Sequence, residues 1–107
     1  HFKHMKKATI QINKKENQAV EIALEDELTI QTVEDAGEKL KNALDNYQRF
    51  AFTIDKVNNL DITYIQLLLA FKTSAEQNGK EVSFTFNLPE EMRKLIQQAG
   101  FNDLLPV

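Results

Sequence analysis

Cysteine is absent from the sequence, which excludes disulfide bonds, catalytic thiols and thiolate metal sites together. A chain without cysteine suits a reducing compartment, so we expect a cytoplasmic protein. Histidine occurs only as His1 and His4. Residues 1–4 have the character of an expression-tag remnant before Met5, and the predicted single domain spans residues 5–107. No native histidine is then expected to act as an acid, a base or a metal ligand.

Glycine is scarce as well, and its three positions, Gly37, Gly79 and Gly100, are isolated from one another. A phosphate-binding loop needs several neighbouring glycines, because their backbone amides must approach the anion closely. The sequence therefore lacks a nucleotide-binding loop of the standard kind. Together with the missing cysteine and histidine, this predicts a protein that is not an enzyme and that has no cofactor and no metal site.

The charge and hydropathy of the chain exclude two further classes. The sequence has 107 residues, of which 42% are hydrophobic and 27% charged, as expected for one globular domain with a packed core. Its net charge is -3 with acids and bases interspersed, so no basic stripe follows a nucleic-acid backbone. No apolar run approaches the roughly 20 residues that span a bilayer. We expect a protein partner, with no nucleic acid and no membrane insertion.

Hydrophobic periodicity predicts the order of the secondary structure. Residues 9–12 and 19–24 alternate between apolar and polar, which indicates two strands joined by a hairpin. Helical spacing begins at Thr32, which forms a capping-box pattern with Asp35, and predicts a helix over 33–46. The apolar run 50–54 predicts a strand inside the sheet, buried on both faces. A helix over 64–75, a strand over 82–86 and a helix that Pro89 opens before Gly100 complete the order.

This ββαβαβα order predicts an α/β sandwich with a mixed sheet of about four strands and three to four helices packed against it. Phe52 and Ile54 are expected to be almost fully buried. Phe101, Leu104 and Leu105 are expected to complete the core.

Two carboxylates flank the predicted polar turn 56–61 after the central strand. Asp55 and Asp61 could hold a divalent cation there, since α/β sheets place functional loops at the carboxyl ends of strands. The simpler interpretation, which we favour, is that Asp55 ends its strand in solvent. Asp61 would then cap the second helix by accepting hydrogen bonds from its backbone amides.

Residues 52–70, FTIDKVNNLDITYIQLLLA, resemble the signature of STAS domains, in which a buried strand leads to Asp-Ser-[Ser/Thr]-Gly and a leucine-rich helix. Residues 27–31 (ELTIQ), 78–80 (NGK) and 87–101 (NLPEEMRKLIQQAGF) are similar to the corresponding family segments. The resemblance covers residues 8–105 and implies the same fold as the periodicity.

The resemblance implies a signalling module that binds partner proteins. In the best-known members, a serine/threonine kinase that is also an anti-sigma factor phosphorylates a Ser or Thr, and phosphorylation decides which partner is bound. Thr63 occupies this phosphoacceptor position. Ile62 and Tyr64 depart from the family pattern, with Tyr64 in place of Gly. A role in chemotaxis or two-component signalling, or as a constitutive subunit of an ABC-type lipid transport assembly, therefore stays open.

The second predicted helix has one side without charges. At about 100° per residue, Tyr64, Ile65, Leu68, Phe71 and Ala75 form the stripe expected to be buried. The opposite side is small and uncharged, which fits either a protein-binding face or a merely solvated one. Tyr64 is interpreted equally as a core aromatic or a docking residue, and Thr63 on the pattern alone as an ordinary early-helix residue. The predicted partner-binding residues are Asp61, Ile62, Thr63, Tyr64, Gln66, Leu67, Ala70 and Ser74.

Overall fold

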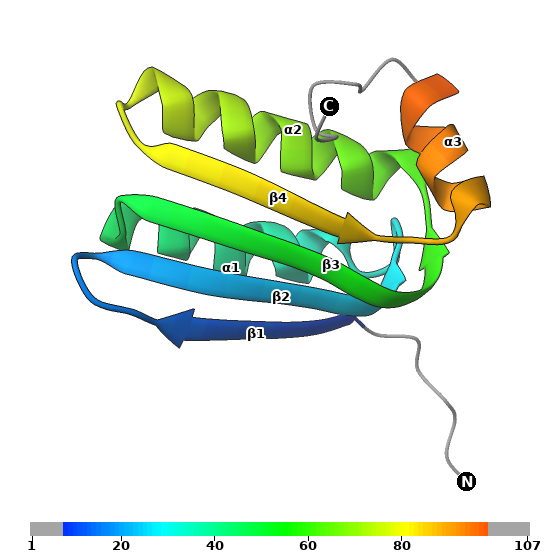
Figure 1. The fold of residues 1–107 in the computed structure, drawn as a ribbon, viewed down its shortest axis with the longest axis horizontal. Helices are drawn as coiled ribbons and strands as arrows, with labels where there is room; N and C mark the ends of the chain where they lie inside the picture. The colour runs from blue at the N-terminus through cyan, green and yellow to red at the C-terminus, as the bar shows by residue number, and fades with distance from the viewer. Residues whose placement is uncertain (1–7, 99–107) are drawn as a thin grey trace, which may run out of the picture.

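The computed structural model describes residues 8–98, which form four strands and three helices in the predicted order (Figure 1). These elements are β1 (Ala8–Lys14), β2 (Ala19–Leu28), α1 (Val33–Asn46), β3 (Arg49–Leu60), α2 (Ile62–Gln77), β4 (Glu81–Asn87) and α3 (Glu90–Gln98). The expectations for residues 1–4, for Gly100 as a helix end, and for Phe101, Leu104 and Leu105 lie outside the described residues. No helix within residues 8–98 has the length and apolar character needed to cross a membrane.

The sheet has the strand order β1-β2-β3-β4 and is mixed, as predicted. β1 and β2 form an antiparallel hairpin whose turn places Asn17 and Gln18 at positive φ. β2, β3 and β4 are parallel, and α1 and α2 are the two crossovers between them. Figure 1 shows both helices along the sheet and α3 at the end where β4 ends. Because both crossovers advance in one direction across the sheet and are right-handed, they cover the same face.

β3 lies inside the sheet as predicted, but the prediction that it is buried on both faces is wrong. Phe50, Phe52 and Ile54 are buried, whereas the alternating residues Ala51 and Thr53 are exposed. The helices pack on one face only, so the other face of β3 remains open to solvent. The predicted burial of Phe52 and Ile54 is confirmed, with 1% and 0% of their surface exposed.

β3 also continues to Leu60, so the predicted polar turn 56–61 is in large part strand. Lys56 adopts a φ of 53°, and its backbone N–H donates to Asp55 Oδ1 at 2.8 Å. The register with β2 shifts nearby, around Asp26, whose φ is 74°. This irregularity has the character of a β-bulge, which bends a strand and increases its twist. Asp55 is therefore a residue within β3, and it does not face Asp61 across a loop.

The core beneath α2 is built from phenylalanine. Phe71 of α2 packs edge-on against Phe50 and Phe52, with ring centroids 4.9 and 5.1 Å apart. Phe52 also stacks on Phe84 of β4 at 4.9 Å. Aromatic pairs in these geometries stabilise a fold by about 0.5–1.5 kcal/mol each beyond the area they bury. The cluster fixes α2 across β3 and β4, and with it the position at which α2 begins.

Candidate functional site

Asp61 joins three segments at the start of α2. Its Oδ1 accepts a hydrogen bond from the Tyr64 backbone N–H at 3.3 Å, and its Oδ2 accepts one from the Ile30 backbone N–H at 2.8 Å. Its own N–H donates to the Leu28 carbonyl at 3.0 Å. The predicted helix cap is confirmed. The same carboxylate also holds the loop after β2 against the helix, which the sequence did not predict.

The loop between β2 and α1 is held by Thr32. The Thr32 hydroxyl donates to the Glu27 carbonyl at 2.6 Å and accepts from the Thr29 backbone N–H at 3.3 Å. It makes no hydrogen bond to the helix, so the predicted capping box with Asp35 is not formed. The Thr32 side chain is buried, and its hydrogen bonds stabilise the loop instead of the helix. With both ends of the loop fixed, Ile30 at its tip is held outward.

Two residues with large, exposed apolar side chains adjoin Asp61: Ile30 donates its backbone N–H to the carboxylate, and Ile62 follows Asp61 in the chain. Ile30 has 64% of its surface exposed and Ile62, the first residue of α2, has 42%. Single exposed apolar residues are common, but two that adjoin the same residue are a candidate contact surface. Ile62 belongs to the predicted partner-binding set. Ile30 was missed, and its only sequence signal is a lone apolar residue between polar neighbours in a loop.

Thr63 lies in the first turn of α2, next to these residues, and is half-buried. Backbone N–H groups in the first turn of a helix have no partner within the helix, and the helix dipole places partial positive charge there. Both features favour a negative group. The position is therefore chemically suited to carry a phosphate.

Tyr64 has to be removed from the partner-binding set, because none of its side chain is exposed. It is part of the hydrophobic core, as the alternative interpretation held. Its hydroxyl has no hydrogen-bond partner among the described residues. Burial raises the pKa of this hydroxyl above its ordinary value, and the Asp35 carboxylate raises it further.

We expect Tyr64→Phe to raise the free energy of unfolding by about 1 kcal/mol at neutral pH, because it removes a buried hydroxyl without a partner. Above about pH 10 the unfolded tyrosine loses its proton while the folded one resists ionisation. The wild type should therefore lose stability with rising pH more steeply than Tyr64→Phe. Urea unfolding at pH 7 and pH 10.5 measures both effects, with Tyr47→Phe as the matched control. A loss of stability in Tyr64→Phe at pH 7 would show that the hydroxyl has a partner.

The remaining predicted residues lie further along α2. Gln66 and Ala70 are exposed, and Leu67 and Ser74 are half-buried. Leu67, Ala70 and Ser74 line a cavity of about 280 Å³ between α1 and α2, which we call the α1–α2 groove. Its other lining residues are Gly37, Leu40, Lys41, Leu44 and Phe71. The predicted set thus divides between the start of α2, the core and this groove.

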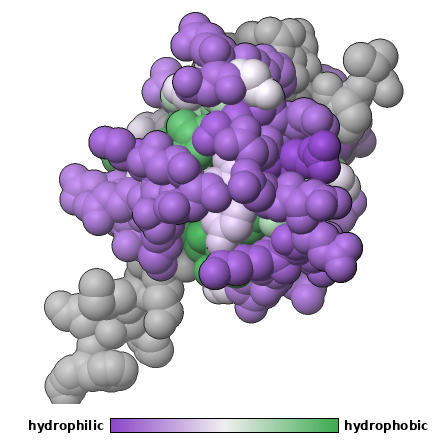
Figure 2. All heavy atoms as spheres, turned by 90° about the vertical axis from the view of Figure 1, so that its left-hand side faces the viewer, coloured by the Kyte–Doolittle hydropathy of each residue, from purple (hydrophilic) through white to green (hydrophobic). Residues whose placement is uncertain are grey.

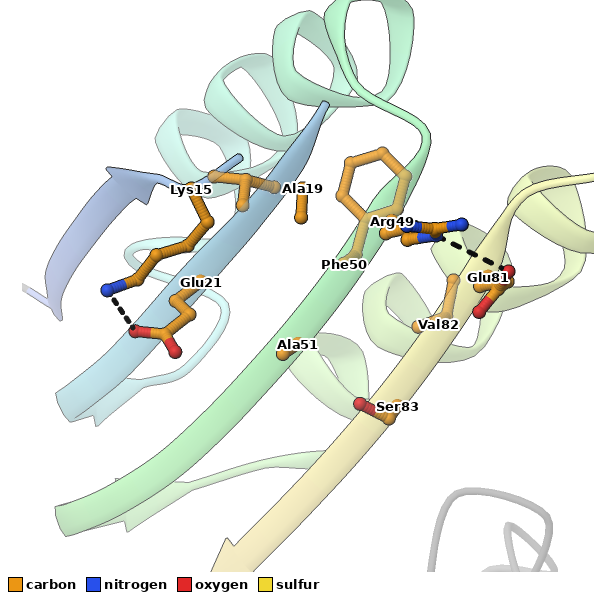
Figure 3. Close-up of a pocket in the computed structure, with 10 residues that line it drawn as sticks. Lys15, Ala19, Glu21, Arg49, Phe50, Ala51, Glu81, Val82 and Ser83 are labelled. Carbon is orange, nitrogen blue, oxygen red and sulfur yellow. Dashed lines mark ion pairs between the residues drawn. The ribbon is translucent and has the colours of Figure 1, made fainter. Parts of the chain in front are cut away.

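A second hollow of about 280 Å³ lies on the open face of the sheet, where β2, β3 and β4 begin (Figure 3). Its charged groups pair with each other: Lys15 lies 3.6 Å from Glu21, and Arg49 lies 3.5 Å from Glu81. Figure 2 looks onto this end of the molecule and shows hydrophilic side chains with small hydrophobic areas between them. Exposed ion pairs of this kind contribute little to the stability of the folded state. Within residues 8–98, no three His, Cys, Asp or Glu side chains are placed to share a metal ion.

Comparison with known proteins gives one family, and several solved structures share the fold, of which two are described. The family model described as "Mlab, STAS domain" matches residues 12–106. The anti-sigma factor antagonist SpoIIAA in its unphosphorylated form superimposes with a TM-score of 0.75 at 19% identity, over 92% of this chain and 86% of that one. The Bacillus cell fate determinant SpoIIAA in its phosphorylated form gives a TM-score of 0.70 at 20% identity, over 92% and 89%. No curated protein sequence matches the chain.

Proposed function

The chain belongs to the STAS domain family, and on this basis we propose that it is a non-catalytic signalling module that binds a partner protein and is switched by phosphorylation at Thr63. One observation carries the proposal: two exposed isoleucines, Ile30 and Ile62, adjoin Asp61, which lies two residues before Thr63. An apolar contact surface and a candidate modification site thus coincide. The partner we propose is a signalling protein of the cytoplasm, such as a serine/threonine kinase that also acts as an anti-sigma factor.

A phosphate on Thr63 would act through charge and bulk, without refolding the domain. The free amides and the positive end of α2 would accommodate it locally. It would also add about 1.5 to 2 negative charges beside Asp61 and next to Ile62. A partner that covers Ile30 and Ile62 would then have to desolvate this charge or give up part of the contact. Phosphorylation is therefore expected to release such a partner.

The comparisons support this proposal at the level of the fold. SpoIIAA, which shares the fold, has been solved both with and without its phosphate, and is described as an anti-sigma factor antagonist. SpoIIAA and this chain are identical at about one position in five, so the shared role is part of the proposal. Thr63 as acceptor rests on the sequence resemblance and on the geometry at the start of α2.

A second candidate function is that of a constitutive subunit of an ABC-type lipid transport assembly. The observation that favours it is the burial of Tyr64, which anchors the turn that carries Thr63. A half-buried threonine in a fixed helical turn is harder for a kinase to reach than one in an exposed loop. In this role Ile30 and Ile62 would contact a transport ATPase subunit permanently.

Capture of partners with two baits distinguishes the candidates. We expect wild-type protein to retain a partner from its source cells that Ile62→Arg loses, because a charged side chain at the centre of an apolar contact prevents close approach. Thr53→Arg, on the open face of the sheet, is the matched control and should retain it. Recovery of a kinase identifies the switch, and recovery of an ATPase subunit identifies the transport role. Equal recovery by wild type and Ile62→Arg would contradict both.

A further inference from the structure

The α1–α2 groove is apolar over most of its surface. Its lining contains the leucines and phenylalanine of two helices, and Lys41 is the one charged side chain in it. An apolar cavity of about 150 Å³ holds a benzene ring. The groove, at about 280 Å³, therefore has room for more than one large apolar side chain.

Small residues keep the groove open. Gly37 on α1 lines it, and so do Ala70 and Ser74 on α2. A Cβ atom built on Gly37 would lie 3.8 Å from Leu67 Cδ1, an ordinary van der Waals distance. Alanine would therefore fit, and glycine inside a helix is less stable than alanine by about 0.5–1 kcal/mol. Packing of the two helices does not require glycine here, whereas a large side chain at this position would fill part of the groove.

Charge differs between the two flanks of the groove. Along α1, the exposed outer flank carries Glu34, Glu38 and Asp45, with Lys41 as its only base. None of these three carboxylates forms an ion pair with a described residue. The flank on α2 carries no charge, since it consists of Gln66, Thr73 and Gln77. The groove is thus negative on one side and neutral on the other.

We infer that the α1–α2 groove binds an amphipathic helix of a partner protein, with its apolar side chains in the groove and its lysine or arginine side chains over α1. Helices bind apolar grooves in this way through residues one turn apart. The carboxylates of α1 set the orientation and favour a basic helix. The inference rests on the proposal that the domain binds a protein partner, but not on phosphorylation. Ala70 is about 10 Å along the helix from Thr63, so the groove stays available in either state.

Two synthetic helical peptides of equal length test this, one with leucine on one face and lysine on the other, and one with glutamate in place of lysine. In amide NMR spectra of the labelled protein, the lysine peptide should shift the signals of groove residues such as Gly37, Lys41 and Ala70. It should bind at least about 10-fold more tightly than the glutamate peptide. Ala70→Arg and Ser74→Arg should each weaken binding of the lysine peptide at least about 10-fold, while amide signals outside the groove keep their positions. Replacing both Glu34 and Glu38 by glutamine should weaken binding of the lysine peptide about 3- to 10-fold.

Thr53→Arg on the open sheet face should bind the lysine peptide as the wild type does. Peptide binding to the groove is measured without phosphorylation, so this inference and the switch at Thr63 can each fail without the other. Equal binding of the two peptides, or shifts that spare the groove, would overturn the inference. Groove signals that depend on protein concentration without peptide would instead assign the groove to a second copy of the chain. Groove signals that change when residues 99–107 are removed would assign it to the chain itself, and either result contradicts a partner helix.

Discussion

Phe52→Ala is expected to lower the free energy of unfolding by about 3–5 kcal/mol, the largest loss that a single truncation in this core should cause. The ring is 1% exposed and contacts two others, Phe71 on α2 and Phe84 on β4. Its removal leaves a cavity between the sheet and α2 and also removes both aromatic contacts. Equilibrium unfolding in urea measures the change, and an unaltered m-value would show that the denatured state is unchanged.

Thr53→Ala, one residue further along β3, is the matched control. Thr53 is exposed on the open face of the sheet, so its truncation should change stability by less than about 0.5 kcal/mol. The contrast between neighbouring residues tests the finding that helices cover one face only. Comparable losses from Phe52→Ala and Thr53→Ala would mean that the second face of β3 is covered as well.

Phosphorylation of Thr63 is expected to weaken partner binding at least about 100-fold, more than any substitution at this surface. About two negative charges would have to be desolvated beside Asp61 and Ile62 when the partner closes over this surface. Titration calorimetry with the captured partner, before and after phosphorylation, measures the change.

Two variants separate charge from structure at this position. Thr63→Ala should bind the partner as the unmodified wild type does, and its stability should change by less than about 1 kcal/mol, because a half-buried hydroxyl near a helix start contributes little. Thr63→Glu adds one charge without the phosphate geometry and should give a smaller loss of affinity. Unchanged affinity of the phosphorylated protein would leave the constitutive role as the better explanation.

The element order and the mixed sheet could be predicted because hydrophobic periodicity is a local property of the chain. The length of β3 could not. Its apolar residues alternate from Phe50 to Ile54, but the next buried residue is Val57, one position out of phase. The backbone irregularity at Lys56 causes this shift. Because of it, the sequence pattern of the second half of the strand resembles that of a polar turn. The two crossover helices determine which face of the strand is covered. Their placement cannot be predicted from the sequence of β3 alone.

The candidate site was predictable in part for the same reason. Asp61 before an apolar helical segment is a local capping signal, and the structure confirms the cap. Ile30 reaches the site through a hydrogen bond between residues 31 positions apart in the chain, so no local pattern identifies it. For Tyr64, an aromatic residue on the buried stripe of a helix fits either a core or a docking role. Its complete burial decides for the core.

Mapping the phosphorylated residue tests whether Thr63 is the switch. The captured kinase and ATP are incubated with the wild type and with Thr63→Ala, and the modified peptides are identified by mass spectrometry. We expect a single phosphate on Thr63 in the wild type and none on Thr63→Ala. Phosphate on another residue, or equal labelling of Thr63→Ala, would contradict it.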